Sequence, residues 1–280
     1  MKVLFIGHPN DNILNRLQRE LEQSNIDILV CFDIRLLQFQ YELSDEKVTS
    51  KIFYKGHEFD THNLSNVIIV SEIRSSSNLS NTNEEDFNYL NSEWHAAIFS
   101  LFAFADCRVL NRPSKTFPFN LFQGFVMNNY LASNKVICSI EEIMQGKDIN
   151  IANSVNSNYR HITSGTTLFD TYLIDKNDYY LCSYSFPLIY FTLVSNSVFK
   201  YSIDNKILRR IPKNEIERVE NEIKHVAKLL SLDYAQFSYS VDSKKLLFRT
   251  LTTFSTIEFP LYNTKLIVNK LKRVISDDGQ

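Results

Sequence analysis

Hydrophobic residues along this chain recur at helical spacing in some stretches and form short, strand-like runs in others. The succession of these two patterns predicts a mixed α/β protein. Near the N-terminus, short apolar runs are separated by a stretch with apolar residues at helical spacing, and Asn10, Asp11 or Asn12 can cap that helix. Strands are expected at 3–7, 26–31 and 67–70, with a helix carrying Ile13, Leu14, Leu17 and Leu21. Strand–helix–strand at this spacing implies a parallel pair with a right-handed crossover.

The next hundred residues predict a hairpin, a long helix and one more strand. Residues 36–66 alternate short apolar and polar groups, and Lys55-Gly56-His57 suits a hairpin turn. Residues 74–92 form a polar loop that leads into the helix. The apolar face of this helix, which predicts a core contact, carries Trp94, Ala97, Ile98, Leu101, Phe102 and Ala105. A strand at 107–110 ends where Pro113 forces the preceding residue into an extended conformation.

The second half predicts a second α+β unit. A helix is expected at 121–134, and an Asn-rich region with short strands at 135–180. Strands at 179–184, 189–194 and 198–203 are expected to form an antiparallel meander. Pro212 suits the first turn of a helix, since its missing N–H has no partner there. The remaining expected elements are a helix face at Ile216, Val219, Ile223, Val226 and Leu230, two strands around a turn at Asp242-Ser243, and a helix at 264–275.

Composition excludes several classes of function. The 280 residues include 30 basic and 32 acidic ones, so the formal charge of −2 gives no basic footprint for nucleic acid. No apolar run is long enough to span a bilayer, and the N-terminus lacks a signal-peptide pattern, so a cytoplasmic protein is expected. The four cysteines form no CxxC pair and the six histidines no HxxxH or HxH pair, so neither disulfides nor zinc are expected.

Glycine usage restricts nucleotide binding. The chain has six glycines and contains neither GxGxxG nor GxxxxGK[ST], the loops whose backbone N–H groups hold phosphates. Any nucleotide therefore needs another mode of binding.

Three stretches resemble the ATP-grasp ligases, including the carboxylate–amine ligases and ribosomal-peptide maturases of that superfamily. Residues Gly7–Asp11 before a helix, with Asp33 after the second strand, are similar to the pre-ATP-grasp domain. Residues Val109–Ser114 and then Asn120 are similar to the junction of the domains, and 229–251 to the C-terminal core. The resemblance implies an ATP-grasp-like α/β and α+β fold, with a Rossmann-like pre-ATP-grasp domain at 1–115, a lid at 116–185 and an antiparallel core at 186–280.

The same resemblance implies that the metal-binding residues have been replaced. ATP-grasp ligases carry an Asp on one core strand and Glu-x-Asn on the next, which hold the Mg²⁺ that bridges ATP phosphates. Here the matching positions are Ser238, Thr250 and Thr252. Other family positions that bind ATP are also changed: Leu121 and Asn153 stand for lysines, Ser157 for glycine, Cys182-Ser183 for the adenine-contacting Gln-Glu, and Tyr190 for arginine.

Three hypotheses follow. In the first, the chain is a pseudoenzyme of a peptide or natural-product modification pathway; it uses no cofactor and binds a peptide or a partner enzyme. In the second, it is an atypical ATP-dependent carboxylate–amine ligase that forms an acyl-phosphate with ATP and Mg²⁺. Its metal would then lie at Glu258 or Asp242. The third, a Rossmann-like binding module using the N-terminal domain alone, lacks the glycine-rich turn.

Five side chains are candidates for ligand binding in either of the first two hypotheses. They are Arg112, Arg160, His161, Arg209 and Arg210. Arg112 is equally explained as a surface or inter-domain salt bridge, whereas solvated charges are the favoured explanation of the other four. Neither nucleic acid nor a membrane is expected as a partner, and a homodimer is possible on the family resemblance.

Overall fold

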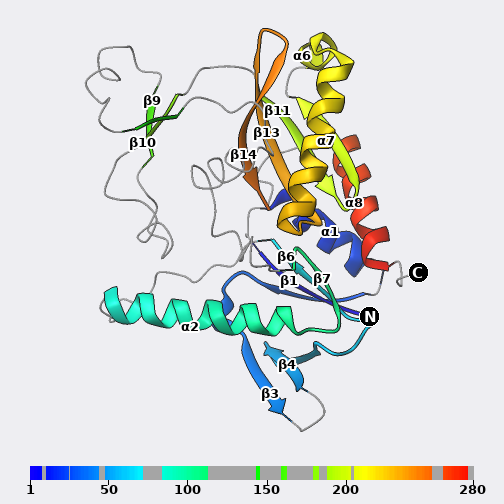
Figure 1. Cartoon of the computed structure of the whole chain (residues 1–280). Coiled ribbons are helices and arrows are strands. Elements are labelled where there is room, and N and C mark those ends of the chain that lie inside the picture. Colours follow the sequence, from blue (N-terminus) through cyan, green and yellow to red (C-terminus); the bar gives the residue numbers. More distant parts are fainter. Residues whose placement is uncertain are drawn as a thin grey trace.

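The chain folds into a parallel sheet, two antiparallel sheets beside it and a separate small sheet. The computed structural model describes residues 1–7, 11–24, 26–43, 48–71, 84–112, 143–145, 159–162, 179–182, 188–202, 205–253 and 261–276 (Figure 1). The expected helix at 121–134 lies outside these residues. No helix in these ranges has the length and hydrophobicity that crossing a membrane requires.

The N-terminal sheet is parallel, as the spacing of its strands predicts. It contains β1 (Lys2–Ile6), β2 (Asp27–Cys31), β6 (Val67–Val70) and β7 (Arg108–Leu110) in the order β2-β1-β6-β7. Helix α1 (Asn12–Glu22) connects the first two strands, and Asp11 caps it by accepting the N–H groups of Ile13 and Leu14 at 3.1 and 3.0 Å. The expected apolar face of α1 is buried.

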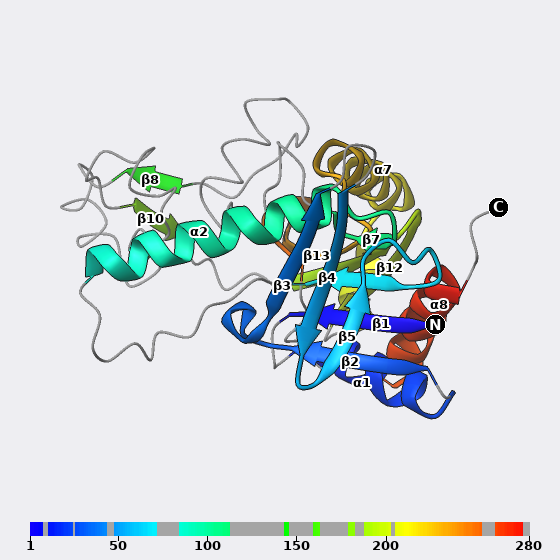
Figure 2. The same ribbon diagram turned by 90° about the horizontal axis from the view of Figure 1, so that it is seen from below.

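Helices cover both faces of this sheet (Figures 1 and 2). Helix α2 (Glu84–Ala103) packs on one face together with a three-stranded antiparallel sheet, ordered β3-β4-β5. Its strands are β3 (Gln38–Leu43), β4 (Val48–Tyr54) and β5 (His57–Asp60), preceded by the short helix η1 (Ile34–Leu36). At the expected hairpin turn, Lys55 and Gly56 have φ values of 50° and 77°. The other face packs against α1 and the C-terminal helix α8 (Leu261–Ser276).

The C-terminal core is a four-stranded antiparallel sheet in the order β12-β11-β13-β14. Its strands are β11 (Leu188–Val194), β12 (Ser197–Ser202), β13 (Tyr234–Asp242) and β14 (Lys245–Thr252). Helix α7 (Lys213–Leu230) buries its expected apolar face against one side of this sheet. Helix α8 packs beside β11 and β12 on the opposite side, so only part of that side is covered by a described helix.

The structure corrects three details. The strand expected at 179–184 is β10 (Tyr179–Cys182), which pairs with β8 (Ile143–Gln145) and β9 (Tyr159–Ile162) in a separate sheet. The three-stranded meander was wrong because β13, not β10, occupies the free edge of β11. The turn of the last hairpin lies at Ser243-Lys244, one residue later than expected, with Ser243 at a φ of 57°. The short helix α6 (Asn205–Arg210) was not predicted.

Candidate functional site

Strand register places Ser238, Thr250 and Thr252, the expected metal-binding positions, together on the core sheet. Ser238 of β13 lies opposite Thr250 of β14 on one side and Tyr190 of β11 on the other. One pair further along, Gln236 lies opposite Thr252 and Thr192. These two rows are called the polar rows below. The alternate residues of the same strands, such as Phe191 and Phe237, pack against α7, so the polar rows belong to the side of the sheet away from that helix.

Two side chains in the polar rows are buried without a hydrogen-bond partner. Thr192 is 0% and Gln236 is 6% exposed, and neither Thr192 Oγ1 nor Gln236 Nε2 has a hydrogen-bond partner among the residues that the structure describes. Ser238 is also buried. A third such atom, the hydroxyl oxygen of Tyr239, lies on the α7 side of the sheet. Buried polar groups in folded proteins are normally hydrogen-bonded, so the two adjacent unpaired groups are an unusual feature of this row.

A β-bulge brings an arginine to this part of the sheet. Ser238 pairs with Thr250 whereas Tyr239 pairs with Phe248, so Arg249 is the extra residue. Burial raises the pKa of the Tyr190 phenol, and the nearby positive charge of Arg249 opposes that rise. Arg249 was not among the expected site residues, although the buried positions of β14 shift phase across it, from Leu246 and Phe248 to Leu251.

The polar rows do not fit a Mg²⁺–ATP complex. The segments 188–194, 234–240 and 246–252 contain no Asp or Glu. Mg²⁺ in phosphate-transferring sites is bound by carboxylates together with the phosphates, and neutral hydroxyl and amide groups do not replace that charge. Within the described ranges, no three or more His, Cys, Asp or Glu side chains gather in a metal-binding arrangement.

Arg112 lies at the junction of the two halves but is occupied there. Its Nη1 donates to the carbonyl oxygens of Phe102, Ala103 and Ala105 at 2.9, 3.2 and 3.0 Å, and Nη2 donates to that of Cys107 at 3.1 Å. The guanidinium thus satisfies carbonyls at the C-terminal end of α2, a favourable place for a cation.

The other candidates are not gathered around the polar rows. Arg160 and His161 lie in β9, opposite Leu181 and Tyr180 of β10. Arg209 and Arg210 are exposed in the last turn of α6. Asp242 ends β13 at the hairpin turn, opposite Lys245. Glu258, Leu121, Asn153 and Ser157 lie outside the described residues.

Asn111 joins the parallel sheet to the core. Its Oδ1 accepts the N–H groups of Asp233 and Tyr234, both at 2.8 Å, and its Nδ2 donates to the carbonyls of Val70 and Tyr234 at 2.9 and 2.8 Å. Its own N–H donates to Asp233 Oδ2 at 3.1 Å. Asn111 adopts a φ of 56°, which asparagine tolerates better than most residues.

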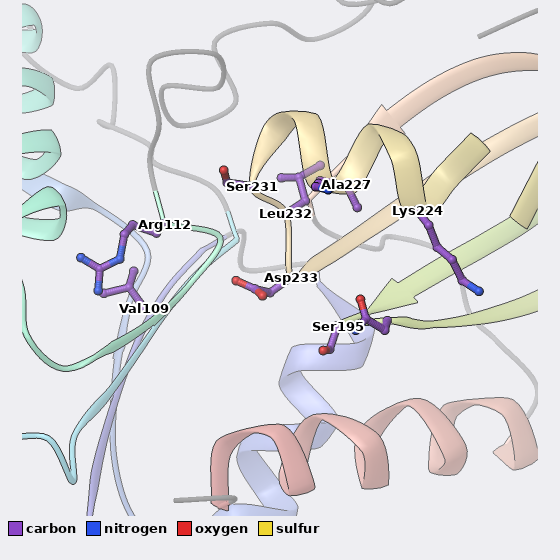
Figure 3. Close-up of a pocket in the computed structure, with 10 residues that line it drawn as sticks. Val109, Arg112, Ser195, Lys224, Ala227, Ser231, Leu232 and Asp233 are labelled. Atoms are coloured by element: carbon purple, nitrogen blue, oxygen red, sulfur yellow. The ribbon is translucent and has the colours of Figure 1, made fainter. Parts of the chain in front are cut away.

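A cavity of about 610 Å³ opens beside this junction, on the α7 side of the core (Figure 3). It is lined by Val109, Arg112, Ser195, Asn196, Lys224, Ala227, Lys228, Ser231, Leu232 and Asp233. In Figure 3, Arg112 and Lys224 lie on opposite sides of Asp233, and the Arg112 guanidinium points away from that carboxylate. This junction pocket is separate from the polar rows.

A serine, a histidine and an aspartate in the N-terminal half have the connectivity of a hydrolase triad. His62 Nδ1 lies 2.7 Å from Asp106 Oδ2, and His62 Nε2 lies 3.4 Å from Ser50 Oγ. Ser50, however, is 3% exposed, and its hydroxyl lies 2.5 Å from Thr61 Oγ1. Because a nucleophile must reach a substrate atom, this buried serine fits a structural link better than catalysis. The cluster ties β4 to the segment before β7.

Known structures share the architecture of the chain. No protein-family model matches the sequence, and neither does any curated protein. The macrocyclase MdnC from Microcystis aeruginosa, bound with precursor peptide MdnA, superposes with a TM-score of 0.67 at 12% identity over 100% of both chains. A RiPP-associated ATP-grasp ligase from Chryseobacterium gregarium, in complex with ADP and a leader and core peptide, gives 0.62 at 11% identity over 100% of this chain and 97% of that one.

A more distant ligase has the same architecture. D-alanyl-alanine synthetase A from Vibrio cholerae gives a TM-score of 0.55 at 8% identity over 99% of this chain and 98% of that one. Together these likenesses show that the chain has the ATP-grasp fold along its whole length, which confirms the expected fold class. At such low identity they show the fold alone.

Proposed function

We propose that this chain is an ATP-grasp-fold protein of a peptide or natural-product modification pathway that binds a peptide or a partner protein and has lost Mg²⁺–ATP chemistry. The observation that carries this proposal is the composition of the polar rows, where Ser238, Thr250 and Thr252 stand at the expected metal-binding positions and the neighbouring strand segments lack any carboxylate. An acyl-phosphate reaction brings several negative charges together and needs cations to stabilise them.

The peptide part of the proposal is supported by the structural neighbours. MdnC was crystallised with its precursor peptide, and the Chryseobacterium ligase with a leader and core peptide. A fold that binds peptides in those proteins offers this chain a binding surface that survives the loss of metal ligands.

A second candidate function is an atypical ATP-dependent carboxylate–amine ligase. The observation in its favour is Arg249, a cation near Tyr190 in the polar rows. This alternative still needs a carboxylate for the metal, and Asp242 lies at the far end of β13, four residues from Ser238.

Titration of the protein with ATP, with and without Mg²⁺, tests the two candidates by calorimetry and thermal shift. A nucleotide that binds the native state alone at a hundred times its Kd stabilises it by about 2.7 kcal/mol, which is a readily measured rise in Tm. The proposal expects neither heat nor a shift at millimolar ATP. Mg²⁺-dependent binding at micromolar ATP would overturn it in favour of the ligase.

A further inference from the structure

The junction pocket has a lining unlike that of a site for an apolar ligand. Of the ten lining residues that the structure describes, seven are polar or charged, and the apolar ones are Val109, Ala227 and Leu232. Its volume of about 610 Å³ falls in the range of small-molecule and peptide side-chain sites. The ligand that matches this lining is therefore polar, and its charge follows from the groups around it.

Positive charge dominates the pocket although the whole chain is negative. The described lining carries three cations, Arg112, Lys224 and Lys228, and one carboxylate, that of Asp233, while the chain has a formal charge of −2. The Arg112 guanidinium points away from Asp233 and donates to backbone carbonyls, so the two lysines are the cations that a ligand can reach. Lys224 and Lys228 are one turn apart on α7 and repel each other. Both are exposed, and neither pairs with an acidic side chain in the part of the chain that the structure describes. The partial negative charge at the C-terminus of α7 explains why a cation is favourable at Lys228, in the last turn of the helix. It does not explain Lys224, which lies one turn earlier.

Asp233 supplies a hydrogen-bond acceptor between these cations. Its Oδ2 accepts the N–H of Asn111 at 3.1 Å, and within the described ranges Oδ1 accepts no hydrogen bond. The hydroxyl groups of Ser195 and Ser231 and the amide of Asn196 also line the pocket. A ligand that satisfies all of these groups brings both carboxylates and N–H donors.

We propose that the junction pocket binds an acidic segment of a peptide, whose side-chain carboxylates pair with Lys224 and Lys228 while a backbone N–H donates to Asp233. Inorganic phosphate fits less well, since it offers no N–H group and carries its negative charge next to the Asp233 carboxylate. This inference rests on the proposed peptide-binding function and adds to it the place and the charge of the peptide.

Fluorescence anisotropy with a fluorescein-labelled hexaglutamate peptide tests the charge and class of the ligand. The peptide should bind at low ionic strength and more weakly at about 0.15 M salt, where exposed charges are screened. Hexaglutamine, free glutamate and inorganic phosphate serve as competitors and should displace it poorly. Displacement by phosphate or free glutamate as strong as by unlabelled hexaglutamate, or no binding of hexaglutamate at all, would overturn the proposal.

A matched pair of double variants tests whether the peptide binds in the junction pocket. K224Q/K228Q should weaken binding of hexaglutamate about tenfold, the effect of two partly exposed ion pairs. K244Q/K265Q makes the same change of net charge at exposed lysines outside the pocket and should leave the affinity within about twofold. Equal losses in both variants would overturn the pocket as the site. Mg²⁺–ATP titration remains a separate test, so a failure of the pocket and a failure of the proposed function are distinguishable.

Discussion

The side-chain amide of Asn111 is expected to stabilise the contact between the two halves of the protein. Asn111→Ala removes four hydrogen bonds, two to the N–H groups of Asp233 and Tyr234 and two to the carbonyls of Val70 and Tyr234. Residue 111 is 6% exposed, so water replaces these bonds poorly. At about 1 kcal/mol for each bond, the free energy of unfolding should fall by about 4 kcal/mol.

Backbone conformation adds to this effect and provides a control. Asn111 has a φ of 56°, a conformation that costs alanine about 1 kcal/mol more than it costs asparagine or glycine. Asn111→Gly removes the same four hydrogen bonds without this strain. The glycine variant should therefore be destabilised by about 1 kcal/mol less than the alanine variant.

Urea unfolding followed by two probes measures both quantities. Fluorescence of Trp94, the single tryptophan, reports α2 and the N-terminal half, while far-UV circular dichroism reports the whole chain. The two transitions should coincide in the wild type and separate in Asn111→Ala as the halves uncouple. A loss below about 1 kcal/mol in both variants would refute the hydrogen-bond argument. Equal losses of unfolding free energy in the two variants would refute the argument from backbone strain.

Three further predictions follow from the described contacts. Arg218 lowers the pKa of Glu215 from its usual value of 4.5. The wild type should therefore have a higher free energy of unfolding than Arg218→Met above pH 4.5, and this difference should decrease as the pH falls below that value. Urea unfolding of both proteins from pH 7 to 3 measures the difference. Burial raises the pKa of the Cys31 and Cys107 thiols to about 11 and about 12, so a variant that keeps only these two cysteines should not react with a disulfide reagent at pH 8 until it unfolds. Gly56→Ala should lower Tm by an amount equivalent to about 1 kcal/mol, because a φ of 77° strains alanine. The added Cβ has no atom within 4 Å, so a steric clash does not contribute. An unchanged Tm would contradict this turn geometry.

Much of the fold could be predicted because its signals are local. Asp11 caps α1 through its own side chain, Lys55-Gly56 makes a two-residue turn, and the apolar face of α7 repeats at helical spacing. The pairing of β10 could not be predicted in this way. Its sequence is equally compatible with β11 as a partner, and the choice depends on β13, which lies more than fifty residues further along the chain.

The candidate site was only partly visible in the sequence. The resemblance to ATP-grasp ligases pointed to Ser238, Thr250 and Thr252, and the strand register brings these positions side by side. Arg249 was missed because the bulge depends on pairing between strands. The role of Arg112 at the end of α2 was also missed, since it depends on four carbonyl groups that converge only in the folded chain. The pocket around Asp233 likewise joins segments far apart in sequence.

We infer that the polar rows keep the shape of an ATP-grasp metal site without its charge. Calorimetry of Mg²⁺-dependent ATP binding, performed on the wild type and on S238D/T250E/T252N side by side, tests this inference. We expect no binding by the wild type and measurable, Mg²⁺-dependent binding by the triple variant, in which carboxylate and amide oxygens stand at paired positions. Micromolar Mg²⁺–ATP binding by the wild type, undiminished in the triple variant, would contradict it.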